Sequence, residues 1–203
     1  KKLRVGASDI AECRIVKRSL DARKKNDIHY TCSAAVTLRA GEDKLLSRLA
    51  GKDVCAYAEP VYDIPRVETA SRPVVVGFGP AGMFAALVLA RAGARPIVLE
   101  RGQDALSRKA AVDAFRAGGE LDPESNVQFG EGGAGTFSDG KLNTGINCVY
   151  VPAVLKEFVD NGAPEDILYL NKPHVGTDKL ETVIKSLREK IISKGGEFYF
   201  NTK

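Results

Sequence analysis

The sequence lacks the residues on which several common kinds of site depend. It contains no tryptophan, one methionine and only two histidines among its 203 residues. Its four cysteines are far apart and form no C-x-x-C pair, which argues against a disulfide reductase and leaves no ligand cluster for a metal. No apolar run approaches the roughly 18 residues of a membrane span, and no signal peptide opens the chain. We therefore expect a cytoplasmic protein with buried, reduced thiols and no membrane partner.

Charge is distributed unevenly along a chain whose net charge is only +4. Residues 1–72 contain 15 Lys and Arg against 10 Asp and Glu, a balance of +5, whereas residues 73–203 contain 15 against 16, a balance of −1. Prolines recur between residues 60 and 73, which favours an extended connector. We predict a small α+β domain over residues 1–71 and a second domain over residues 72–203.

Neither end of the chain has the form of a natural terminus. The sequence begins at Lys1 rather than at methionine, and it stops at Lys203 directly after an expected strand at residues 197–201. We therefore expect a fragment in which the small domain is truncated at its N-terminus and the second domain at its C-terminus.

Alternating residues predict a hairpin in the small domain. Apolar side chains at every second position of residues 28–38 indicate a half-buried strand. Residues 10–20 are expected to pair with it through the polar connection at residues 21–27. A helix over residues 42–50 and a strand over residues 54–58 complete the predicted α+β unit.

The sequence VVVGFGPAG at residues 74–82 is the most informative segment of the second domain. It matches the G-x-G-x-x-G pattern directly after an apolar strand and before an apolar helix. Gly77 permits a tight turn, Gly79 lets backbone N–H groups approach a pyrophosphate, and Gly82 lets the helix pack closely on the strand. The N-terminus of that helix then faces the phosphates with the positive end of its dipole. These residues, which we call the glycine turn, predict a dinucleotide site.

An acid ends the next expected strand and narrows the choice of dinucleotide. Glu100 follows Gly82 by 18 residues, near the roughly 20 expected for the acid that binds an adenosine ribose. Its carboxylate would repel the 2′-phosphate of NADP, and the neighbouring Arg101 offsets that repulsion only in part. NAD and FAD both remain open on this motif alone.

The remaining patterns predict further helices and a parallel sheet, as in α/β proteins. Asp104 is expected to cap a helix that runs to Ala117. A second helix starts at Pro152, and a third has a capping box at Asp178 and Glu181 followed by an apolar stripe. Between the first two lies a loop of roughly 30 residues, longer than compact domains usually tolerate without a functional reason.

That long loop contains a second glycine-rich segment, FGEGGAGTFSDGK at residues 129–141, called the second glycine loop below. Its glycines free backbone N–H groups to curl around an anion or a flat ring, although a flexible surface loop would have the same composition. Residues 135–141 also fit the first part of a phosphate-binding P-loop. Leu142 stands where that motif needs a hydroxyl for Mg²⁺, so ATP or GTP hydrolysis is disfavoured.

The two glycine segments, with VLERG at residues 98–102 and PHVGTDKL at residues 173–180, closely resemble a family of bacterial FAD-dependent dehydrogenases of unassigned substrate. The segment IVKRSLDARKK at residues 15–25 resembles the small N-terminal domain of the same proteins. The resemblance implies a Rossmann-like FAD-binding domain, incomplete here, preceded by a small α+β domain. Family members are similar in having a substrate domain and a late FAD contact that this chain does not contain.

The same resemblance implies FAD contacts position by position. The pyrophosphate would be bound at Gly77, Gly79, Pro80, Ala81 and Gly82, and the adenosine end at Glu100 and Arg101. The flavin side of the cofactor would lie along Gly132, Gly133, Thr136, Phe137 and Ser138.

Such an enzyme would transfer a hydride to or from flavin N5, with a small-molecule substrate and NAD(P)H as a candidate electron donor. The sequence names no catalytic acid or base. His29 on the expected hairpin and His174 before the last helix are favoured as structural or surface residues. Asp139 and Lys141 fit flavin contacts and a solvated loop equally well.

Two other functions remain open. An NAD-dependent dehydrogenase also fits the glycine turn, but it would be colourless, whereas bound flavin absorbs in the blue. A nucleic-acid or partner-binding module could use the basic residues around the hairpin turn, which are Lys17, Arg18, Arg23, Lys24 and Lys25. Asp21 and Asp27 dilute that charge, so a solvated turn is favoured over nucleic-acid binding.

Overall fold

The computed structural model describes residues 2–49, 51, 53–146 and 148–203. The chain divides into two compact units: unit 1 comprises Lys1–Val61 and Asp166–Pro173, and unit 2 comprises Tyr62–Glu165 and His174–Lys203. The sequence placed a single boundary near residue 71, so residues 62–71 and 166–173 are assigned differently in the two divisions.

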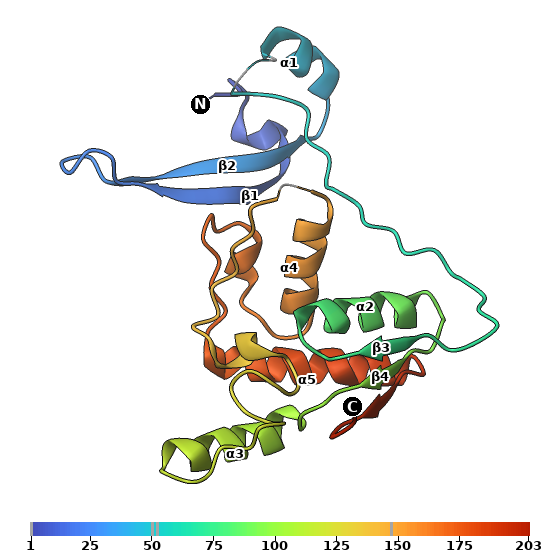
Figure 1. Ribbon diagram of the computed structural model, residues 1–203. Coiled ribbons are helices and arrows are strands. Elements are labelled where there is room, and N and C mark those ends of the chain that lie inside the picture. The colour runs from blue at the N-terminus through green and yellow to red at the C-terminus, as the bar shows by residue number, and fades with distance from the viewer. Residues whose placement is uncertain (1, 50, 52, 147) are drawn as a thin grey trace. The chain divides into compact units, whose positions relative to one another are not determined.

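Unit 1 is built on one long antiparallel hairpin (Figure 1). Strand β1 (Ile10–Asp21) pairs with β2 (His29–Leu38), with Asp21 opposite His29 at the turn and Ile10 opposite Leu38 at the open end. A short 3-10 turn, Ala7–Asp9, precedes β1, and helix α1 (Glu42–Leu49) follows β2. The predicted pairing of these two segments is confirmed, and Ala50, the expected last residue of the helix, lies outside the described residues.

Two expectations for unit 1 are wrong. Residues 54–58 form no strand, and the Val54 carbonyl instead accepts the Gly51 N–H at 2.8 Å, which turns the chain. The hairpin is also more exposed than a half-buried strand. Tyr30 is 62% exposed, and Cys13, Cys32 and Cys55 are exposed rather than buried. For the hairpin residues, the physical reason is that two paired strands form a single layer, and alternation alone supplies no second layer to cover one face.

Unit 2 is a mixed α/β unit with a three-stranded parallel sheet (Figure 1). The strands are β3 (Val74–Val76), β4 (Ile97–Leu99) and β5 (Glu197–Tyr199), in the order β3-β4-β5. The helices are α2 (Pro80–Arg91), α3 (Ala105–Arg116), α4 (Tyr150–Asp160) and α5 (Thr177–Ser193), with 3-10 turns at Ala134–Phe137 and Glu165–Leu168. The strands and helices expected in this part of the chain are present, and they differ from expectation only at their ends.

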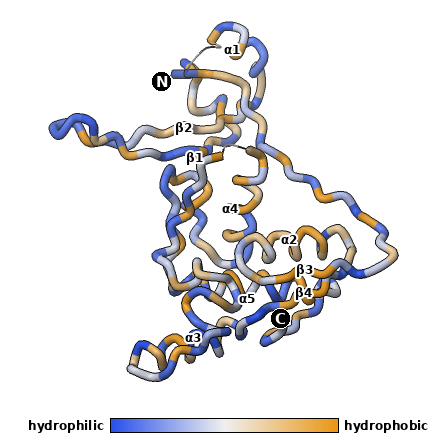
Figure 2. The backbone as a smooth tube through the Cα atoms, viewed as in Figure 1, coloured by the Kyte–Doolittle hydropathy of each residue, from blue (hydrophilic) through white to orange (hydrophobic). Residues whose placement is uncertain are grey.

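The core of unit 2 forms where α2 and α5 pack against each other and contact the sheet. Helix α2 is apolar on most sides, as Figure 2 shows, and it buries Met83, Ala86, Leu87 and Ala90. Helix α5 buries the predicted apolar stripe of Leu180, Val183, Ile184, Leu187 and Ile191. Residues spaced three and four apart share one face of a helix, and this spacing is why the stripe could be read from the sequence.

One predicted helix start is correct and one is wrong. Asp104 caps α3, because its carboxylate accepts the N–H groups of Leu106 at 3.1 Å and Ser107 at 3.3 Å. Helix α5, by contrast, has Gly176 at its N-cap with φ at +85° and no side-chain cap. Because Gly176 turns the chain into the helix early, Asp178 lies inside the first turn, where its charge favours the helix dipole instead of capping. None of the helices in the described residues is long and apolar enough to cross a membrane.

Candidate functional site

The glycine turn brings the start of α2 very close to the end of β3. The chain turns at Gly77, whose φ is +88° and whose N–H donates to the Leu99 carbonyl at 2.7 Å. A Cβ on Gly82 would lie 1.9 Å from the Gly77 carbonyl oxygen, which no side chain can tolerate. Only glycine at residue 82 therefore lets α2 begin this close to the turn.

The N-terminus of α2 has the form of an anion site. Gly79 is its N-cap, Pro80 occupies the first helical turn, and no side chain in the described residues caps the helix. The backbone N–H groups of Ala81 and Gly82 in this first turn are therefore free of side-chain acceptors. A Cβ built on Gly79 would meet the Gly133 Cα at 3.9 Å, which is an ordinary van der Waals contact. An uncapped helix start of this kind fits a pyrophosphate.

Glu100 fastens the end of β4 to the glycine turn. Its side chain accepts the Phe78 N–H at 2.6 Å and the Gly102 N–H at 2.8 Å, and the residue is only 5% exposed. Each carboxylate oxygen can accept a second hydrogen bond, which suits the hydroxyls of a ribose. The Arg101 guanidinium lies 4.6 Å from the centre of the Phe129 ring and pairs with Glu124 at 3.5 Å.

The second glycine loop lies directly against the glycine turn, although about fifty residues separate them in sequence. The Gly132 N–H donates to the Phe78 carbonyl at 2.8 Å. A Cβ on Gly133 would lie 3.2 Å from the Gly79 Cα and 3.2 Å from the Pro80 Cδ. The structure therefore brings Gly132 and Gly133 together with Gly79 and Pro80.

The other predicted flavin-side residues turn their side chains into the loop itself. The Thr136 hydroxyl is buried and donates to the Glu131 carbonyl at 3.3 Å. The Phe137 ring packs against the Arg108 guanidinium at 4.8 Å, and the Ser138 hydroxyl donates to the Gly135 carbonyl at 2.8 Å. These three side chains shape the loop, so the backbone is the part that remains to face a ligand.

Asp139 and Lys141, the two charged residues at the end of this loop, pair with each other. Their side chains meet at 2.5 Å, and both are exposed. The hydrogen bond from Lys141 lowers the pKa of the Asp139 carboxyl. An exposed pair of this kind adds little to stability.

Sequence reasoning missed a buried guanidinium beneath the second glycine loop. Arg108 is fully buried and donates to three carbonyl oxygens, those of Asn126 at 2.8 Å, Glu131 at 2.6 Å and Gly133 at 2.9 Å. Burial lowers its pKa to about 10. The available signal was its place on α3, since Arg108 shares the buried face of that helix with Ala105 and Val112.

Sequence reasoning also missed the carboxylate of Glu131. This side chain is fully buried, and its Oε2 accepts the Ala105 N–H at 2.7 Å and the Arg188 Nη1 at 2.9 Å. Burial raises the pKa of Glu131. A glutamate between glycines carries no pattern of its own, because its partners come from α3 and α5.

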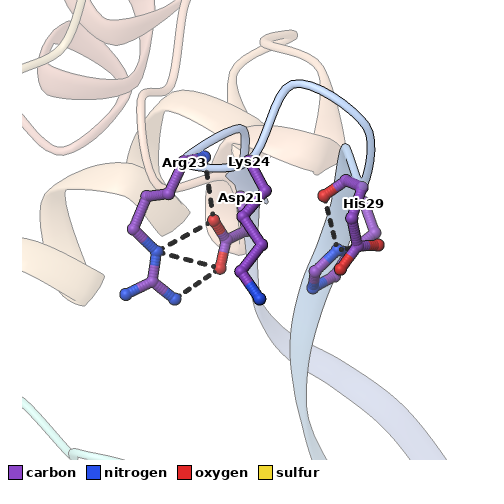
Figure 3. A pocket seen from close by; sticks show the side chains of 5 residues that line it. Asp21, Arg23, Lys24 and His29 are labelled. Atoms are coloured by element: carbon purple, nitrogen blue, oxygen red, sulfur yellow. Dashed lines mark hydrogen bonds and ion pairs between the residues drawn. The ribbon is translucent and has the colours of Figure 1, made fainter.

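One basic residue of the hairpin turn of unit 1, Arg23, pairs with an acid of the same turn. Figure 3 shows the Arg23 guanidinium clasping the Asp21 carboxylate, with contacts of 2.6 and 3.0 Å. Hydrogen bonds from Arg23 lower the pKa of Asp21 to about 2. His29 contacts the Asp27 carboxylate at 3.1 Å, and the Arg18 guanidinium lies 5.2 Å from the Tyr30 ring.

Two segments of the chain match known domain families. Residues 71–119 match the FAD binding domain, and residues 1–37 match a domain of unknown function, DUF8436. A relative from Clostridium beijerinckii, described as an uncharacterized protein, is 51% identical over 208 residues. That alignment covers all of this chain and 38% of the relative, so the chain spans less than half the length of the relative it matches.

The FAD binding domain match contains the glycine turn, α2, Glu100 and all of α3. FAD is therefore the cofactor of this segment, which decides between the two dinucleotides that the glycine turn left open. The same match supports a flavin-dependent oxidoreductase.

Proposed function

We propose that unit 2 is the Rossmann-like FAD-binding part of a cytoplasmic dehydrogenase that acts on a small molecule, with NAD(P)H as a candidate electron donor. One observation carries the proposal: the second glycine loop touches the glycine turn beside the uncapped N-terminus of α2. When bound, FAD supplies two-electron chemistry through hydride transfer at its N5 atom. Parallel strand order, with ligand-facing turns at the strand ends, is the arrangement expected of such a domain.

Different residues of the proposed site bind different parts of FAD. The N–H groups of Ala81 and Gly82 hold the pyrophosphate at the positive end of α2. Glu100 accepts the ribose hydroxyls while it keeps the glycine turn fixed through the Phe78 N–H. The backbone at Gly132 and Gly133 extends the same surface toward the flavin side. Arg101 contributes positive charge at the adenosine end, where it lies against Phe129.

The test is the absorbance spectrum of the purified full-length protein, followed by titration with FAD under fluorescence. The protein should absorb in the blue or take up added FAD. Gly79→Val should abolish binding, because the new side chain fills the space through which the pyrophosphate approaches. Gly145→Val is the matched control, since a Cβ at Gly145 would have nothing within 4 Å and that glycine lies outside the proposed site.

Two results would contradict the proposal. One is a colourless protein that fails to take up FAD. The other is a Gly79→Val variant that retains flavin with the affinity of the Gly145→Val control.

A further inference from the structure

The second glycine loop makes two backbone hydrogen bonds to other parts of unit 2, one to the glycine turn and one to the residue before Asp104. The Gly132 N–H donates to the Phe78 carbonyl, and the Glu131 N–H donates to the Gln103 carbonyl at 3.0 Å. A glycine-rich segment loses much conformational entropy when it becomes ordered. The two backbone hydrogen bonds of this loop therefore need further interactions to hold the loop in place.

That support comes from the side chain of Glu131. The Glu131 carboxylate is fully buried, and it accepts the N–H of Ala105, the first residue of α3. Every helix start leaves four backbone N–H groups without an intrahelical partner, and an anion at this point accepts a hydrogen bond from one of them. The same oxygen accepts Nη1 of Arg188 from α5 at 2.9 Å. One carboxylate thus ties the loop to two helices.

We propose that Glu131 is a positioning residue of the FAD site: its carboxylate, anchored on the N-terminus of α3 and on Arg188, holds the second glycine loop against the glycine turn. The inference rests on the proposed FAD site for its functional consequence, but the anchoring itself is a property of the protein without cofactor. Preset loops bind more tightly because the ordering cost is met before the ligand arrives.

Burial and hydrogen bonding distinguish this role from that of a surface carboxylate. Glu131 Oε1 is buried without a hydrogen-bond partner among the described residues, so the side chain makes its contacts through one oxygen alone. A glutamine at this position keeps an acceptor oxygen for Ala105 and Arg188 and places its amide where Oε1 stands. An alanine removes both bonds and leaves the Ala105 N–H and Arg188 unpaired.

The test is amide hydrogen exchange in the purified full-length protein without FAD, read at Ala105 and Gly132. Glu131→Ala should speed exchange at both amides by about tenfold or more, because charge-assisted hydrogen bonds are lost. Glu131→Gln should stay close to the wild type. Glu120→Ala is the matched control, since Glu120 is an exposed acid that precedes the second glycine loop in the chain. If Glu131→Ala does not fold, Glu131→Asp, whose carboxylate is one methylene shorter, tests the same bonds.

FAD affinity provides the second readout. Titration followed by flavin fluorescence should show a dissociation constant raised by about tenfold or more in Glu131→Ala and nearly unchanged in Glu131→Gln. Unchanged exchange at Gly132 in Glu131→Ala, or equal FAD affinity in that variant and the wild type, overturns the inference. A wild-type protein that binds no FAD but shows the expected exchange pattern counts against the proposed cofactor site and leaves the anchoring established.

Discussion

The glycine turn and the second glycine loop are both glycine-rich, yet they are held in place in opposite ways. The glycine turn is fixed by backbone groups of the adjoining strands and by Glu100, all within one strand-helix-strand unit. The second glycine loop is fixed by Arg108 and Arg188, charged side chains that reach it from two helices outside the loop. The first is therefore a local motif, and the second is a tertiary assembly built on buried charge.

The largest expected effect in this comparison is the loss of the buried guanidinium. Arg108→Met keeps the apolar stem but removes the donor from the carbonyls of Asn126, Glu131 and Gly133. At about 1 kcal/mol or more for each acceptor left unpaired, we expect the free energy of unfolding to fall by about 3 kcal/mol. Denaturant unfolding of the variant and the wild type measures this change in the free energy of unfolding.

Arg116→Met is the control for that experiment. Arg116 belongs to the same helix and also approaches the Phe137 ring, at 5.9 Å, but it is exposed. Its loss should change the free energy of unfolding by less than about 0.5 kcal/mol. Equal effects of the two substitutions would show that the second glycine loop is not held by buried charge.

The next effect tests the local character of the glycine turn. Gly82→Ala forces a Cβ to within 1.9 Å of the Gly77 carbonyl oxygen, so α2 must shift away from the turn. We expect a loss of about 2 kcal/mol in the free energy of unfolding, as for other overpacked sites. Gly79→Ala meets nothing closer than 3.9 Å and should leave stability nearly unchanged. A Gly82→Ala variant as stable as Gly79→Ala would contradict the close approach.

This contrast explains how much could be predicted from the sequence. The strand, glycine turn and α2 follow a pattern of neighbouring residues, and so does the α5 stripe, because spacing along a helix fixes which residues share a face. The roles of Arg108 and Glu131 could not be predicted, because their partners are set by the packing of α3 and α5. The exposure of the hairpin could not be predicted for the same reason. Alternation indicates which side chains share one face of a strand, but it does not indicate which other elements cover that face.

A smaller effect concerns the helix that carries Arg108. Asp104→Ala removes the acceptor of the Leu106 and Ser107 N–H groups at the start of α3. Loss of an N-cap of this kind costs about 1 kcal/mol, whereas Asp104→Asn keeps an acceptor and should stay near the wild type. Thermal unfolding of the two variants side by side provides the measurement. Equal melting temperatures for Asp104→Ala and Asp104→Asn would mean that the α3 start is secured by Glu131 alone.

The last effect is a pH dependence that the second glycine loop should have and the glycine turn should lack. Burial raises the pKa of Glu131 in the fold, against the hydrogen bond from Ala105 and the charge of Arg188, and Asp104 and Glu100 add to the rise. The folded protein therefore holds this proton to a higher pH than the unfolded chain does, and its stability falls as pH rises through that interval. Glu131→Gln cannot titrate there. The free energy of unfolding of Glu131→Gln minus that of the wild type should grow steadily as pH is raised from about 4 toward neutrality, by denaturant unfolding at each pH. A difference that stays constant would mean that Glu131 has the same pKa in the folded and the unfolded chain, and a difference that falls would mean that Arg188 and the Ala105 N–H outweigh the cost of burial.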